Sequence, residues 1–184
     1  MFRATEGLFA QAGAALLSRR LAMVLGLALP HAAMADETPE NSDVAKLVRR
    51  AESANAALMR GDMTTWLGIA SPIAKDFTLM QPFGGPPSRG FDVSSSHLEE
   101  LSRYFRNGEG KTEVVQTYAT TDMIVLVLIE RQHGEVGGLP DQEWSLRVTL
   151  VYQRRGSEWQ FVHRHADPLV RNIGLERSAA LARG

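Results

Sequence analysis

Two histidines, one residue apart, lie in the segment WQFVHRHADPLV, Trp159–Val170. His163 and His165 precede Asp167 and Pro168, and this combination allows three interpretations. Two histidines near a carboxylate could bind a metal ion, but a third protein ligand would have to come from a neighbouring strand, and the spacing indicates none there, so we predict no metal site. A histidine paired with a carboxylate could transfer a proton during catalysis. We favour the third interpretation, in which the histidines pack and hydrogen-bond on a sheet face used for dimerisation.

Alternation along a strand divides these side chains between the two faces of the sheet. One face is predicted to carry the aromatic, histidine and aspartate side chains: Trp159, Phe161, His163, His165 and Asp167. The opposite face is predicted to carry Gln160, Val162, Arg164 and Ala166.

Further candidate residues lie upstream of this strand. Glu130 ends an otherwise apolar run, where it is either a general base at a pocket mouth or, as we favour, a solvated or ion-paired strand end. Arg147 interrupts the next apolar run, and we expect a cross-strand pair with Glu130. The aromatic residues that could line a pocket include Trp66, Phe83, Tyr104 and Tyr118.

The elements that must position these residues fall into two halves. Apolar spacing predicts a helix over 44–60, a short helix over 62–70 and a third helix over 94–107, with a β-rich segment at 76–83. In the second half, four strands are predicted at 112–120, 123–133, 143–155 and 159–167. Short connections favour antiparallel neighbours. We therefore expect an α+β domain, in which the N-terminal helices pack on the concave face of a curved antiparallel β-meander.

Composition narrows the possible functions. The 184 residues are predicted to form a single domain, and the formal net charge of −1 gives no electrostatic reason to bind nucleic acid. The chain contains no cysteine, which excludes disulfides, thiolate nucleophiles and iron–sulfur clusters. We predict no cofactor.

The N-terminus has the three parts of an export signal over residues 1–35. Arginines precede the short apolar run Leu21–Leu29, and the small residues Ala33 and Ala35 precede the expected cleavage site. The secretory and twin-arginine routes both stay open, because Arg19 and Arg20 are paired but Ala22 stands where a bulky phenylalanine is usual. We expect a periplasmic or secreted protein without a stable membrane anchor. A flexible leader (36–43), a domain (44–170) and a C-terminal tail (171–184) should follow.

The order of these elements, ending in RRGSEWQFVHRHADP, resembles the SnoaL-like and nuclear transport factor 2-like superfamily, which has a cystatin-like α+β cone fold. Within it, the chain is most similar to the association domain of calcium/calmodulin-dependent kinase. That similarity is carried by Arg154, Arg155, Trp159, His163 and His165, and the resemblance as a whole covers roughly residues 44–169.

The resemblance implies a cone-shaped pocket between sheet and helices, and homodimers that form through the sheet. It also implies that Arg164 faces the pocket while His163 and His165 face the partner subunit. Ala166 departs from the kinase domain, which has a pocket arginine at this position. Members of the superfamily include isomerases, cyclases, dehydratases and assembly domains, so the fold alone does not define a function.

We therefore expect an exported domain that binds a small apolar or weakly anionic molecule. The candidate ligand-binding residues are Arg164, Tyr104, Tyr118, Trp66, Phe83 and Arg147. One alternative is a cofactor-independent isomerase, dehydratase or cyclase that uses His163, His165 and Glu130. A non-catalytic assembly module is the other alternative.

Overall fold

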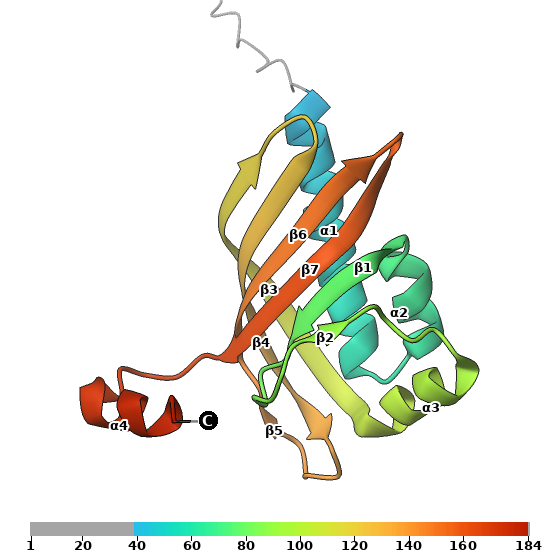
Figure 1. The fold of residues 1–184 in the computed structure, drawn as a ribbon. Helices are drawn as coiled ribbons and strands as arrows, with labels where there is room; N and C mark the ends of the chain where they lie inside the picture. Colours follow the sequence, from blue (N-terminus) through green and yellow to red (C-terminus); the bar gives the residue numbers. More distant parts are fainter. Residues whose placement is uncertain (1–38, 184) are drawn as a thin grey trace, which may run out of the picture. The chain divides into compact units, whose positions relative to one another are not determined.

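The computed structural model describes residues 39–183, and the structural statements below concern this part of the chain. The helices are α1 (Pro39–Met59), α2 (Met63–Ala70), α3 (Ser95–Tyr104) and α4 (Gly174–Leu181) (Figure 1). The strands are β1 (Ile73–Met80), β2 (Ser88–Arg89), β3 (Phe105–Ala119), β4 (Met123–Val136), β5 (Gln142–Glu143), β6 (Leu146–Arg155) and β7 (Glu158–Pro168). The described helices are too short or too polar to cross a lipid bilayer. The predicted export signal lies outside the described residues.

The strands form one curved sheet in the order β2-β1-β7-β6-β4-β3, and β5 pairs with β4. β3, β4, β6 and β7 are antiparallel neighbours, which confirms the predicted meander. β1 lies parallel to β7, so the complete sheet is mixed. The α+β fold class is confirmed. Helix α1 packs on β3 and β4, while α2 and α3 lie at one end of the sheet (Figure 1).

Helix α1 lies unusually close to β3, and two glycines allow this. A Cβ at Gly108 would lie 2.8 Å from the backbone oxygen of Met59, and one at Gly110 would lie 3.3 Å from Nδ2 of Asn55. The third helix was predicted to run to residue 107, directly before Gly108, but α3 ends at Tyr104 and β3 begins at Phe105. The prediction was wrong there because the requirement for glycine comes from a contact with a distant helix.

Arg154 and Trp159 join the β6–β7 hairpin to α1. Arg154 and the indole nitrogen of Trp159 both donate to one oxygen of Asp43, at 2.7 and 3.0 Å. The Arg154 guanidinium also lies 4.4 Å from the centre of the Trp159 ring. The hydrogen bond from Trp159, with those from Arg154 and Lys46, holds the pKa of Asp43 below its ordinary value against the opposing effect of burial. Asp43, expected in a flexible leader, is therefore a helical residue that anchors α1.

A β-bulge changes the alternation along β7. Tyr152 pairs with Phe161 and Val151 pairs with His163, so Val162 is an extra residue in the strand. Phe161 consequently lies on the same face as Arg164, whereas alternation had placed it with the histidines. That part of the prediction was wrong, because a bulge is not visible in a single sequence.

We call the sheet face covered by α1 the inner face and the opposite one the outer face. On β4 the side chains alternate between buried and partly exposed along most of the strand. The buried apolar residues of the inner face form the core, together with Leu47 and Ala51 of α1: Phe77, Ile124, Leu126, Leu128, Leu146, Val148, Leu150, Tyr152, Phe161 and Ala166. The outer face of β4 presents Val125, Val127 and Ile129, which are only partly buried.

Candidate functional site

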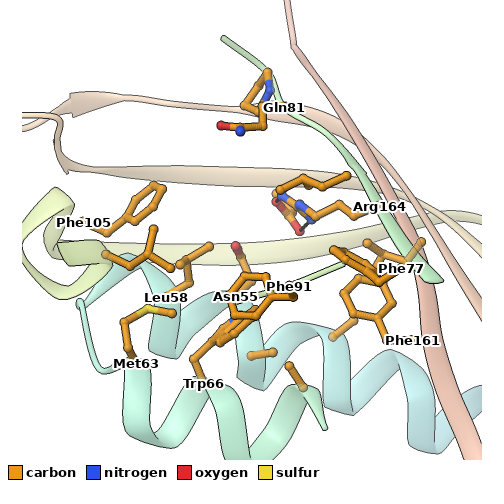
Figure 2. Close-up of a pocket in the computed structure, with 18 of the residues that line it drawn as sticks. Asn55, Leu58, Met63, Trp66, Phe77, Gln81, Phe91, Phe105, Phe161 and Arg164 are labelled. Atoms are coloured by element: carbon orange, nitrogen blue, oxygen red, sulfur yellow. Dashed lines mark hydrogen bonds and ion pairs between the residues drawn. The ribbon is translucent and has the colours of Figure 1, made fainter. Parts of the chain in front are cut away.

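A cavity of about 460 Å³ lies between the inner face and the helices (Figure 2). Its walls are mostly aromatic and aliphatic: Leu58, Met63, Trp66, Phe77, Phe83, Phe91, Phe105 and Phe161. Ring contacts hold the walls together, since the ring centres of Trp66 and Phe91, and those of Phe77 and Phe161, are both 4.9 Å apart. A cavity of this size and composition is typical of a small-molecule site.

Two charged side chains meet in the cavity as an ion pair. Arg164 donates to both carboxylate oxygens of Glu130, at 2.9 and 2.8 Å. The side chain of Glu130 is 2% exposed and that of Arg164 is 18% exposed. Burial alone would lower the pKa of Arg164, but the charge and hydrogen bonds of Glu130, with a smaller effect of Tyr152, raise it above its ordinary value.

This pair replaces the one expected from the sequence. Arg147 pairs in register with Ile129 on the outer face and is exposed, so the predicted Arg147–Glu130 pair is wrong. The pair that forms instead is electrically neutral, and each carboxylate oxygen of Glu130 already accepts a hydrogen bond. Arg164 is therefore engaged within the protein, and Glu130 is poorly placed to act as a general base.

Two amides form a second polar group in the cavity wall. Asn55 of α1 donates through Nδ2 to Oε1 of Gln132 on β4, at 2.8 Å, and both residues are 6% exposed. The other amide atom of Asn55, Oδ1, is buried and has no hydrogen-bond partner within the described residues. Sequence reasoning missed Asn55. The available signal was a polar residue on the apolar stripe of the helix, four residues after Ala51 and three before Leu58.

Arg50 and Tyr152 lie at another part of the cavity wall. Arg50 donates to the backbone oxygens of Ile69, Ala70 and Trp159, the first two at the C-terminal end of α2. Burial lowers the pKa of its guanidinium. The same guanidinium lies 5.4 Å from the centre of the Tyr152 ring. Burial raises the pKa of Tyr152 to about 12, so its phenol is neutral at physiological pH.

The structure brings together some of the predicted site residues and separates others. Four of them line the cavity: Glu130, Arg164, Trp66 and Phe83. Three others lie outside it: Tyr104, Tyr118 and Arg147. The Tyr104 ring packs against the edge of the Phe83 ring, with ring centres 6.2 Å apart, whereas Tyr118 is 60% exposed on β3.

His163 and His165 lie on the outer face, away from the cavity. Nδ1 of His163 is hydrogen-bonded to the hydroxyl of Thr78 at 2.7 Å, and His165 lies 3.4 Å from the carboxylate of Asp167. Burial, and then the charge of His165, lower the pKa of His163, while the contact with Thr78 opposes them. Among residues 39–183, no three histidine or acidic side chains are arranged to hold a metal ion.

The histidine that does line the cavity is His97, which the sequence did not single out. It lies in the first turn of α3, where its backbone nitrogen donates to the Ser94 hydroxyl at 3.4 Å and so forms the helix cap. Its ring centre is 5.7 Å from that of Phe91, in an edge contact. His97 and Asp92 thus place ionisable groups in the wall beside α3.

No protein-family model and no curated protein matches the sequence. Solved structures do match the fold. A candidate dehydratase of the nuclear transport factor 2-like family from Streptomyces avermitilis matches with a TM-score of 0.55 and 18% identity, over 71% of this chain and 99% of that one. A candidate scytalone dehydratase from Novosphingobium aromaticivorans matches with a TM-score of 0.57 and 11% identity, over 73% and 89%.

A candidate calcium/calmodulin-dependent protein kinase II association domain from Xanthomonas campestris also matches. Its TM-score is 0.51 at 18% identity, and the match covers 73% of this chain and 91% of that one. Similarities at this level of identity show the architecture and leave the activity open. The chain therefore has the nuclear transport factor 2-like fold.

Proposed function

We propose that this domain binds a small, predominantly apolar and uncharged molecule in the cavity. The observation that carries the proposal is the aromatic and aliphatic wall around about 460 Å³, interrupted by a few buried polar groups. An uncharged ligand is favoured over an anionic one because Arg164 is neutralised by Glu130, and Arg50 is engaged by backbone oxygens.

A cavity-filling variant tests this function. Leu58→Trp places a larger side chain in the cavity wall, and we expect it to weaken the binding of the apolar bicyclic probe indene at least about tenfold in calorimetric titrations. The matched control Leu175→Trp changes a leucine that is 90% exposed on α4, and it should bind indene like the wild type. Absence of binding by the wild type, or equal losses in both variants, would contradict the proposal.

A cofactor-independent isomerase or lyase is the second candidate function. It is supported by the ionisable side chain of His97 in the cavity wall and by the two fold neighbours that are candidate dehydratases. The discriminating experiment identifies the co-purified ligand by native mass spectrometry and then incubates it with fresh protein. Loss of water or rearrangement of the ligand, abolished in His97→Gln, supports catalysis, whereas an unchanged ligand supports binding alone.

We also propose that the protein is exported to the periplasm or secreted, on the sequence pattern of residues 1–35. Expression of the full chain in a Gram-negative host should give a periplasmic product whose first residue is Asp36. Replacing Arg19 and Arg20 by lysines blocks the twin-arginine route and leaves the ordinary secretory route open. Full-length protein confined to the cytoplasm would contradict export.

Self-association through the outer face is the remaining proposal, and it also covers the possibility of a non-catalytic assembly module. Val125, Val127 and Ile129 form a partly exposed apolar row along β4, and the fold neighbours include an association domain. We expect a homodimer by light scattering coupled to size-exclusion chromatography. Val127→Glu should dissociate it, while Val170→Glu, at an exposed valine after β7, should not.

A further inference from the structure

We propose that the ligand of the cavity carries a hydrogen-bond donor, a hydroxyl or an N–H group, which bonds to Oδ1 of Asn55. This inference rests on the proposed binding function and adds to it the chemical class of the ligand: a neutral, mostly apolar ring compound with a donor. Figure 2 shows the Asn55 side chain reaching from α1 into the space lined by Leu58, Phe91 and Arg164.

The described part of the chain provides a partner for one side of the Asn55 amide and none for the other. Nδ2 donates to Gln132 at 2.8 Å, and β3 lies directly behind it, where a Cβ at Gly110 would be only 3.3 Å away. In this arrangement Nδ2 of Asn55 is the donor and Oε1 of Gln132 is the acceptor, so Oδ1 is the atom of the Asn55 amide that this hydrogen bond does not use. Oδ1 is turned away from Gln132, and it is buried with no hydrogen-bond partner among residues 39–183.

The two arginine side chains of the cavity donate to other acceptors. Arg164 donates through both Nη atoms to Glu130, and Arg50 donates to backbone oxygens near α2. A buried acceptor without a donor is rare in folded proteins, because its lost hydration is not replaced. A molecule bound in the cavity can supply that donor.

The same geometry selects the kind of group that can reach Oδ1. A hydroxyl or N–H presents a hydrogen to the oxygen, whereas an ionised carboxylate presents only lone pairs and would add a negative charge to a cavity that already contains Glu130. An ether or a hydrocarbon of the same shape fills the apolar space but leaves Oδ1 unsatisfied. The cavity should therefore distinguish molecules that differ only in the donor.

Indole and indene make this comparison, because they share a bicyclic shape and differ in one ring position, N–H against CH₂. We expect wild-type protein to bind indole about tenfold more tightly than indene in calorimetric titrations, the ratio that one added hydrogen bond supplies. Equal binding would overturn the inference and leave the proposed function standing, since Oδ1 would then be satisfied by water. Failure to bind either probe would overturn both.

A double variant locates the effect. Asn55→Leu with Gln132→Met removes both amides together and keeps similar volumes, so it leaves no new unpaired polar group. We expect this variant to bind indole and indene equally. The control Asn172→Leu changes an exposed asparagine before α4 and should keep the preference for indole. A preference that persists in the double variant would overturn the assignment to Asn55.

Discussion

The two faces of the sheet are built from the same strands, but polar side chains differ in burial and pairing between them. On the inner face, Glu130 and Gln132 are almost completely buried, and each has a partner inside the protein. On the outer side, pairs such as Arg131–Glu113 and His165–Asp167 are exposed to solvent. The candidate histidines lie on the outer side, while the few polar side chains of the cavity are set in a mostly apolar wall. Burial of an isolated polar residue is thus the better indication of the site.

The largest effect is expected from breaking the buried ion pair. Glu130→Gln leaves the guanidinium of Arg164 without its counter-ion, and we expect the free energy of unfolding to fall by about 3–5 kcal/mol in urea denaturation. The matched variant Glu113→Gln breaks the exposed pair with Arg131 and should cost about 0–1 kcal/mol. Similar losses would contradict the difference between the faces. Replacing both members by apolar residues, Glu130→Leu with Arg164→Met, should recover most of the loss, because no buried charge or unpaired amide then remains.

Neighbouring aliphatic residues on β4 give a sharper comparison. Leu128 is buried on the inner face, and Ile129 is partly exposed on the outer face. We expect Leu128→Ala to lower the free energy of unfolding by about 3 kcal/mol, because it leaves a gap in the core. Ile129→Ala should cost about 1 kcal/mol. The measurement is urea denaturation at low protein concentration, and a larger effect for Ile129 would show that the outer face is also packed.

A third prediction uses the buried phenol of the inner face. Burial raises the pKa of Tyr152 from 10.0 to about 12, so the folded protein keeps a proton that the unfolded chain loses. The stability that this proton contributes is fully present below about pH 10 and is lost as the pH rises to about 12. The loss should be about 2–3 kcal/mol. Tyr152→Phe should not show it when free energies of unfolding are compared across this range, and identical pH dependence would contradict the prediction.

The smallest effect is expected at the outer face. Burial and the charge of His165 lower the pKa of His163 below its ordinary 6.5, so protonation disfavours the folded state. The associated stability is present above about pH 6.5 and decreases as the pH falls below it. Histidine ring signals in NMR titrations should give a midpoint below 6.5 that disappears in His163→Gln. His133, whose pKa is raised by a hydrogen bond from its ring to Asp141, is the control with a midpoint above 6.5.

Much of the fold could be predicted because the meander depends on local alternation. Leu126 and Leu128, or Leu146 and Val148, occupy every second position of their strands, and both pairs are buried as expected. The start of β3 at Phe105 could not be predicted, since the glycines there are required by the close passage of α1. Such a requirement appears only when the helix is in place.

The cavity was less predictable than the strands around it. Glu130 and Arg164 were both identified as candidates, but their pairing reaches across the intervening strand β6, and no spacing along the chain reports a contact of that kind. Asn55 contacts Gln132 because α1 crosses β3 and β4 at the point along the strands where Gln132 lies. Local patterns indicate which side a residue faces, whereas these contacts depend on how separate elements are placed.

The extra residue Val162 has a consequence for changes in chain length. Its removal would leave Phe161 and Arg164 directed to the same side as before, since a regular strand would then connect them. A deletion between His163 and Pro168 would instead exchange every later side chain between the two sides. Removal of Val162 should therefore be tolerated better than a deletion nearer Pro168, because the strand is shortened there without altering what the cavity recognises.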